Sequence, residues 1–155
     1  MLAALLGRGD DKHVYWRLLS DSLTGGNSWS IKEIEMYDVT AGGADLTAGG
    51  SVISSGSWST EGGGFGPSKA FDGSTSGNSA ATAGTNPAIG SVGIGYQFAA
   101  PVDIQRVRLF QHGASDRTVT AVRVQYSDDG TNFFDAWTAT GLNDAGGIWE
   151  ELIRS

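Results

Sequence analysis

Short runs in which apolar and polar residues alternate constrain the fold of this chain more than any other feature of its sequence. In residues 121–126, apolar side chains alternate with Arg123 and Gln125, and residues 106–109 repeat the pattern. A period of two places successive side chains on opposite faces of a β-strand. No window has the apolar spacing of a long amphipathic helix. The sequence therefore predicts an all-β protein.

Turn signals separate these runs at close intervals. The chain has 24 glycines in 155 residues, about twice the usual share of this residue. Asp129-Gly130 is typical of a tight hairpin, after which Phe133 and Phe134 are expected to begin the return strand, and residues 148–153 are expected to form a final strand. Many short strands with frequent turns predict an antiparallel jelly-roll β-sandwich of two facing sheets.

The length and composition favour one domain and disfavour several classes of partner. A chain of 155 residues predicts a single domain, which we place at residues 13–155 behind an N-terminal arm of residues 1–12. The absence of cysteine excludes disulfides and thiolate metal sites. The net charge of −7 disfavours nucleic acid and anionic lipid as partners. No apolar run approaches the roughly 20 residues of a membrane helix, so no membrane insertion is expected.

The residues that catalysis requires are sparse. A hydroxyl or thiol nucleophile needs an adjacent base, and the chain has two histidines, His13 and His112, and no cysteine. Its paired acids are neighbours in sequence, and neighbours on a strand point to opposite faces rather than across a cleft. Glycine-rich segments lack the helix or the lysine that phosphate-binding loops require. The sequence predicts that the chain is not an enzyme.

Four segments together carry a resemblance to a known family. They are residues 67–73 (PSKAFDG), residues 122–133 (VRVQYSDDGTNF), residues 15–18 with 30–37 (YWRL and SIKEIEMY), and residues 95–98 with 101–102 (GYQF and PV). This set resembles the discoidin-like, coagulation factor V/VIII C-type domains of the galactose-binding-like superfamily, over about residues 15–137. The resemblance implies a jelly-roll sandwich that acts as a binding module.

The order of the segments departs from that of the family. The Tyr-Trp-Arg and Glu-Ile-Glu strands usually come last, and here they come first. The chain is therefore expected to be circularly permuted, which a sandwich tolerates when its ends lie close together. Similarly ordered modules occur in phage and bacterial surface proteins.

The resemblance also implies a structural Ca²⁺ ion. Many members hold calcium between the Ala-x-Asp-Gly loop and a glutamate of a closing strand, which would place the Asp72 and Glu33 carboxylates on the ion. Backbone oxygens would complete the shell of hard ligands that calcium prefers, from Lys69, Ser74 and Lys32. A threonine of the family falls at Gly77, which has no side chain. The alternative is that Asp72 only caps a turn while Gly73 supplies a positive φ.

The ligand-binding surface is expected in loops at one end of the sandwich, since a rigid scaffold frees loops for recognition. Trp58 lies in a Gly/Ser-rich loop and is a candidate stacking platform for a sugar. Four polar residues cluster after a central strand and are candidate hydrogen-bonding partners: Gln111, His112, Asp116 and Arg117. The alternatives are that Trp58 fills the bottom of the core and that His112 and Arg117 belong to a solvated loop.

Two functions remain open at this point. The first is a non-catalytic adhesin or decoration protein of a phage virion that binds cell-surface glycan. The second is a purely structural decoration protein that binds capsid or tail subunits and no sugar. The lack of cysteine and of a secretory leader favours a virion, with a bacterial extracellular or cell-surface location as the alternative. A homo-oligomer is compatible with both.

Overall fold

Two antiparallel sheets make up the fold, in agreement with the prediction from alternation. The computed structural model describes residues 11–22, 28–55, 64–81 and 90–155, and its elements within these ranges are as follows. The strands are β1 (His13–Ser20), β2 (Ser30–Tyr37), β3 (Ser51–Ser54), β4 (Ala80–Ala81), β5 (Gly93–Val102), β6 (Arg106–Gln111), β7 (Ala121–Ser127), β8 (Phe134–Thr140) and β9 (Trp149–Ile153). A 3₁₀ helix, η2 (Pro67–Phe71), is the helical element of the described part.

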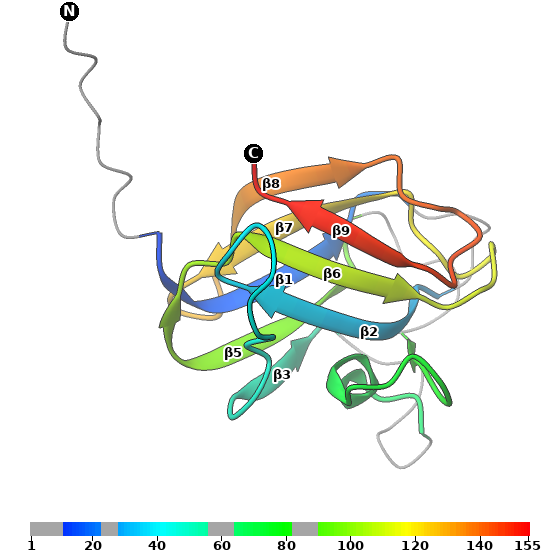
Figure 1. Cartoon of the computed structure of the whole chain (residues 1–155), viewed down its shortest axis with the longest axis horizontal. Coiled ribbons are helices and arrows are strands. Elements are labelled where there is room, and N and C mark those ends of the chain that lie inside the picture. The colour runs from blue at the N-terminus through cyan, green and yellow to red at the C-terminus, as the bar shows by residue number, and fades with distance from the viewer. Residues whose placement is uncertain (1–10, 23–27, 56–63, 82–89) are drawn as a thin grey trace, which may run out of the picture.

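The first two strands lie inside the sheets rather than at their edges. One sheet has the order β3-β5-β1-β7-β8 and the other the order β4-β2-β6-β9. The two layers face each other in Figure 1. Trp16 of β1 pairs with Tyr96 on one side and with Tyr126 on the other. These interior positions are compatible with the permuted strand order that the sequence predicts.

The core fills the space between the sheets and follows the predicted alternation. Val122 and Val124 are fully buried, as expected, and Tyr126 packs against the core at its border. The two tryptophans of the described core, Trp16 and Trp29, are fully buried. Further core side chains come from β1, β2, β5, β6 and β9, among them Leu18, Ile31, Ile34, Met36, Ile94, Leu109 and Leu152.

The hairpin between β7 and β8 confirms the predicted turn. Gly130 has a φ of 70°, a conformation that glycine adopts without strain. The Asp129 carboxylate accepts backbone hydrogen bonds from Asn132 at 2.7 Å and Thr131 at 2.8 Å, and these bonds lower the pKa of Asp129. β8 begins at Phe134, one residue later than expected, and the ring of the preceding Phe133 lies under the guanidinium of Arg17.

A bulge in β2 determines which of its side chains face the core. The register with β6 shifts between Ile31 and Glu33, which pair with Gln111 and Phe110. The extra residue, Lys32, resets the alternation, so that Ile31 and Ile34 both join the core. Glu33 therefore points to the outer side of the four-stranded sheet, where η2 and the chain after it cover the first half of β2.

Candidate functional site

Gln111 is the residue that holds the loops at one end of the sandwich. Its side-chain carbonyl accepts hydrogen bonds from the Trp29 indole at 2.9 Å and the Val119 amide at 2.8 Å. Its amide nitrogen donates to the Val119 carbonyl and to Glu150 Oε2, each at 3.0 Å. A buried amide with all these bonds made fixes the backbone on either side of it.

The expectation that Gln111 faces a ligand is therefore wrong. Its exposed fraction is 0%, because β6 continues to Gln111 and the alternation that buries Leu109 also turns Gln111 inward. Gln111 therefore has a structural role and does not contact a ligand at the surface.

Two loops are joined through this buried amide, and we call them the end loops: residues 112–118 and 141–147. Glu150 accepts a hydrogen bond from the Asn143 amide at 2.6 Å, and Thr118 Oγ1 donates to the Asp144 carbonyl at 2.7 Å. Gly146 has a φ of 62°, and a Cβ there would lie 2.1 Å from the His112 carbonyl oxygen. The close approach of the two end loops thus depends on glycine at this position.

The first end loop brings three of the expected ligand residues together. Arg117 Nε lies 3.8 Å from Asp116 Oδ1, and both side chains are about half exposed. Burial lowers the pKa of His112, and the positive charges of Lys32 and Arg117 lower it further, while Asp116 acts in the opposite direction. His112, Asp116, Arg117 and Lys32 therefore form one electrostatic group. Trp58 lies outside the described residues.

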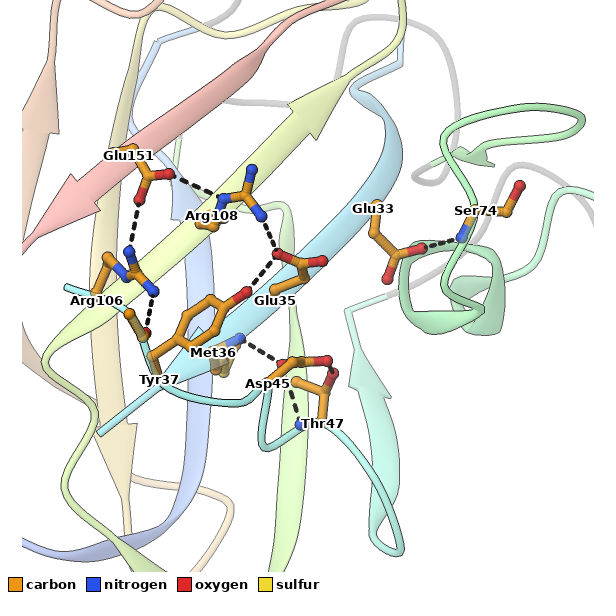
Figure 2. Close-up of polar contacts among 11 residues, drawn as sticks. Glu33, Glu35, Met36, Tyr37, Asp45, Thr47, Ser74, Arg106, Arg108 and Glu151 are labelled. Atoms are coloured by element: carbon orange, nitrogen blue, oxygen red, sulfur yellow. Dashed lines mark hydrogen bonds and ion pairs between the residues drawn. The ribbon is translucent and has the colours of Figure 1, made fainter. Parts of the chain in front are cut away.

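The expected cation ligands also lie close together. The Ser74 backbone N–H donates to Glu33 Oε2 at 2.9 Å and to Asp72 Oδ1 at 3.1 Å; Figure 2 shows the first of these bonds. Glu33 is 2% exposed. Burial raises the pKa of Glu33 to about 7, and the charge of Asp72 adds to the rise, against hydrogen bonds from Ser74 and Gly73 that lower it.

The two lysines of the expected set use their side chains elsewhere. Lys69 Nζ lies 3.5 Å from Asp72 Oδ2, and Lys32 Nζ donates to the Gly77 carbonyl. No cluster of three acidic or histidine side chains able to hold a metal occurs in the described residues. Two carboxylates, one of them buried, nonetheless converge on one backbone amide, and carboxylate oxygens are ligands that a hard cation prefers. The bond from Ser74 to Asp72 is equally what a turn cap would make.

Comparison with known proteins identifies the family. The family model of the F5/8 type C domain matches residues 51–149, which is more than half of the chain. The chain belongs to the F5/8 type C domain family. No curated protein and no solved structure gives a significant match to it.

The match agrees with the fold of this F5/8 type C domain and with its unusual strand order. The matched segment begins at β3 and leaves out β1 and β2, the two strands whose sequences resemble the last strands of the family. Domains of this family are generally non-catalytic binding modules. In the described part of this F5/8 type C domain, no helix is both long and apolar enough to cross a membrane.

An ion-pair network that the sequence reasoning missed covers the outer face of the four-stranded sheet (Figure 2). Arg108 contacts Glu35 at 2.7 Å and Glu151 at 2.9 Å, and Arg106 contacts Glu151 at 3.5 Å. Tyr37 donates to Glu35 at 2.6 Å. The sequence signal was present, since acids of β2 and arginines of β6 alternate at the same period. Because its charges are mutually compensated, this face of the F5/8 type C domain is better explained as structural.

Proposed function

We propose that this F5/8 type C domain is a non-catalytic module that binds glycan through its end loops. The observation that supports the proposal is the buried Gln111 amide, which fixes both end loops on the sandwich while Asp116 and Arg117 remain exposed. A scaffold that fixes loops reduces the entropy lost on binding. Planar polar side chains held in this way suit the hydroxyl groups of a sugar.

Each side chain of the first end loop has a distinct role in the proposal. Arg117 donates hydrogen bonds to sugar hydroxyls or ring oxygens, and Asp116 accepts them. Burial and the charges of Lys32 and Arg117 lower the pKa of His112 and so favour its neutral form, and a neutral imidazole has one donor and one acceptor nitrogen. A few such bonds, each contributing about 1 kcal/mol, predict weak binding of a single sugar and tighter binding of a repeated one.

Calcium is the second part of the proposal. A divalent ion beside Glu33 and Asp72 neutralises two carboxylates that repel each other, one of which is desolvated. Asp72 and Glu33 hold the ion together with backbone oxygens of Lys69, Ser74 and Lys32. The ion ties η2 and the chain after it to β2, which stiffens the segment next to Lys32 and hence next to His112.

The non-catalytic role is supported by the surroundings of the two histidines. His13 stacks on Tyr126 with ring centroids 3.8 Å apart and lies 3.0 Å from Asp128. The His13 ring is thus used for packing and for its contact with Asp128, and Nδ1 of His112 is buried. Nucleophilic catalysis instead uses a base bonded to a hydroxyl or thiol.

A glycan array with the intact domain tests the proposal. We expect binding to selected glycans, and a loss of about tenfold in affinity, or about 1.4 kcal/mol, on Arg117→Ala. Arg154→Ala is the matched control, because this arginine lies at the other end of β6, where it contacts Asp11 and Asp103. Binding to no glycan, or equal loss in both variants, would contradict the proposal.

The particle that carries the module is a separate proposal. We place it on a phage virion, with capsid or tail subunits as protein partners, supported by the lack of cysteine and by the resemblance to permuted surface modules. Mass spectrometry of purified phage particles tests this placement. Peptides of the chain in the particles support it, and peptides confined to the bacterial envelope contradict it.

A further inference from the structure

A hollow on the outer face of the five-stranded sheet is a second candidate binding site, separate from the end loops. Its volume is about 130 Å³. Gly93 lies at its floor, because Ile94 faces the core and the alternation turns Gly93 outward. Ile53 lies on one side of it, and Arg17 and Phe133 on the other. The hollow exists because β5 has no side chain at Gly93.

Arg17 is held in a fixed orientation at the wall of the hollow. Its Cζ lies 3.7 Å from the centroid of the Phe133 ring, and its Nε donates to Gln125 Oε1 at 2.8 Å. The Gln125 amide is fixed in turn by a 2.6 Å bond to Asp135. Stacking on an aromatic ring and one hydrogen bond leave the terminal nitrogens of a guanidinium available to a ligand.

The charge of Arg17 is not compensated in the way that the other described arginines are. Each of those has a carboxylate within 4 Å, as Arg123 has in Asp21 and Asp135. In the described part of the chain, no carboxylate pairs with Arg17. Burial lowers the pKa of Arg17, and the neighbouring charge of Arg123 lowers it further, while the charge of Asp135 acts in the opposite direction. A guanidinium without a carboxylate partner favours an anion in this hollow, although the net charge of −7 opposes the approach of anions from a distance.

The rest of the lining favours a small polar ring over a bare ion. Ser55 Oγ accepts a hydrogen bond from the Gly93 amide at 2.9 Å. The hydroxyl hydrogen of Ser55 can then be donated to a ligand hydroxyl. Ile53 supplies an apolar wall for the face of a ring. The volume is below the roughly 300 Å³ at which sites for drug-sized ligands begin, so one ring fills it.

We propose that this hollow binds the carboxylate of an acidic sugar, with Arg17 as the charged partner and Ser55 as a hydroxyl partner. A carboxylate presents two oxygens in a plane, which matches the two terminal nitrogens of a guanidinium. The sugar is a uronic acid, either free or as one residue of an acidic polysaccharide. The site does not depend on the end loops or on calcium.

Titration of the full chain with D-glucuronate and D-galacturonate, followed by NMR of its backbone amides, tests the proposal. D-glucose and D-galactose are the matched probes, since they differ by the carboxylate. We expect the uronates to shift the amide signals of Gly93 and Ser55, and the neutral sugars to leave them unchanged at the same concentration. Arg17→Gln is expected to lower the uronate affinity at least tenfold.

A second variant keeps the test valid if Arg17→Gln fails to fold. A Cβ at Gly93 would lie 3.4 Å from Arg17 Cδ and from Leu19 Cδ1, an ordinary van der Waals distance. Gly93→Ala therefore fills the floor of the hollow without distorting the strand, and it too should lower the uronate affinity at least tenfold. No shift at Gly93 with either uronate, or equal shifts with neutral sugars, would overturn the proposal.

The two proposed sites can fail separately. Arg117→Ala removes an end-loop side chain and should leave uronate binding at Gly93 unchanged. Uronate binding abolished by Arg117→Ala and unaffected by Gly93→Ala would overturn this inference and leave the end-loop site standing. Glycan binding that is lost on Arg17→Gln and unaffected by Arg117→Ala would contradict the end-loop site and leave the hollow at Gly93 as the binding site. A further titration uses polygalacturonate at the same concentration of uronate residues as the free sugar. Tighter binding of the polymer than of the free sugar would identify an acidic polysaccharide as the ligand, because a repeated ligand binds more tightly.

Discussion

Glu33 and Asp72 point their carboxylates at the same backbone N–H, that of Ser74, with oxygen to nitrogen distances of 2.9 and 3.1 Å. The two acids come from segments 39 positions apart, on β2 and just after η2. Two carboxylates that share one donor repel each other unless one is protonated or a cation lies between them. The following two predictions separate these states.

In the absence of metal, stability should fall as pH rises. The pKa of Glu33 is about 7 in the folded chain and 4.5 in its ordinary state, so the folded form binds the proton more tightly. The protonated Glu33 side chain contributes fully to the free energy of unfolding below pH 4.5, and this contribution is lost as the pH rises to about 7. The loss is on the order of 3 kcal/mol at most. Urea unfolding with a chelator between pH 4.5 and 8 measures it.

Two variants show whether Glu33 causes this slope. Glu33→Gln should flatten it, because the amide does not titrate. Asp38→Asn, at an exposed carboxylate after β2, should leave it unchanged. A slope that persists in Glu33→Gln would assign the pH dependence to other groups.

Bound calcium should offset the loss of stability that the metal-free protein shows as the pH rises. Binding to metal-free protein should raise the melting temperature, and near pH 6 it should release a proton from Glu33, because the ion requires the carboxylate. Calorimetric titration in buffers of different ionisation enthalpy detects both the binding and the proton. Asp72→Ala should abolish the heat. Absence of heat in the unmodified protein would leave Asp72 with the role of a turn cap alone.

Gln111→Leu should destabilise the fold and disorder the end loops. The leucine side chain is of similar size, but it leaves the Trp29 indole N–H and both backbone groups of Val119 without their partner. The expected loss is about 3 kcal/mol. Urea unfolding measures the loss, and faster hydrogen exchange at Val119 locates it. Unchanged exchange at Val119 would mean that Gln111 does not hold the loop.

Gly146→Ala should cost more stability than Gly141→Ala. Both glycines have a positive φ, of 62° and 73°, so alanine at either is strained by roughly 1–2 kcal/mol. A Cβ at 146 also collides with the His112 carbonyl, whereas a Cβ at 141 meets no atom within 4 Å. The difference between the variants, about 2 kcal/mol, measures how tightly the end loops approach. Equal losses would show that the loops can separate freely.

The sequence predicts the layers and the strand faces of this domain because both depend on local alternation. The pattern of residues 121–126 predicts which side chains of β7 enter the core, and the Asp-Gly pair predicts the turn that follows. Residues 67–73 and 122–133 predict the family, which the match over residues 51–149 confirms.

The site is less predictable, because it depends on register and on long-range contacts. The sequence predicts that Gln111 follows the strand, whereas the structure continues the alternation two residues past Leu109 and turns Gln111 inward. The bulge at Lys32 turns Glu33 toward η2, and no pattern in the sequence predicts this bulge. The stacking of Arg17 on Phe133 joins residues 116 positions apart, and the sequence of neither segment predicts this contact.

The ion pair of Asp11 with Arg154, 3.1 Å long, brings the two described ends of the chain to the start of β6. The end loops lie at the far end of the same strand, beyond Gln111. Anything joined before Asp11 or after Arg154 therefore attaches at the opposite pole from His112 and Arg117. If the domain is attached to a larger assembly through either of these two ends, its end loops face away from the attachment point. The connecting chain then does not block the end loops from reaching another surface.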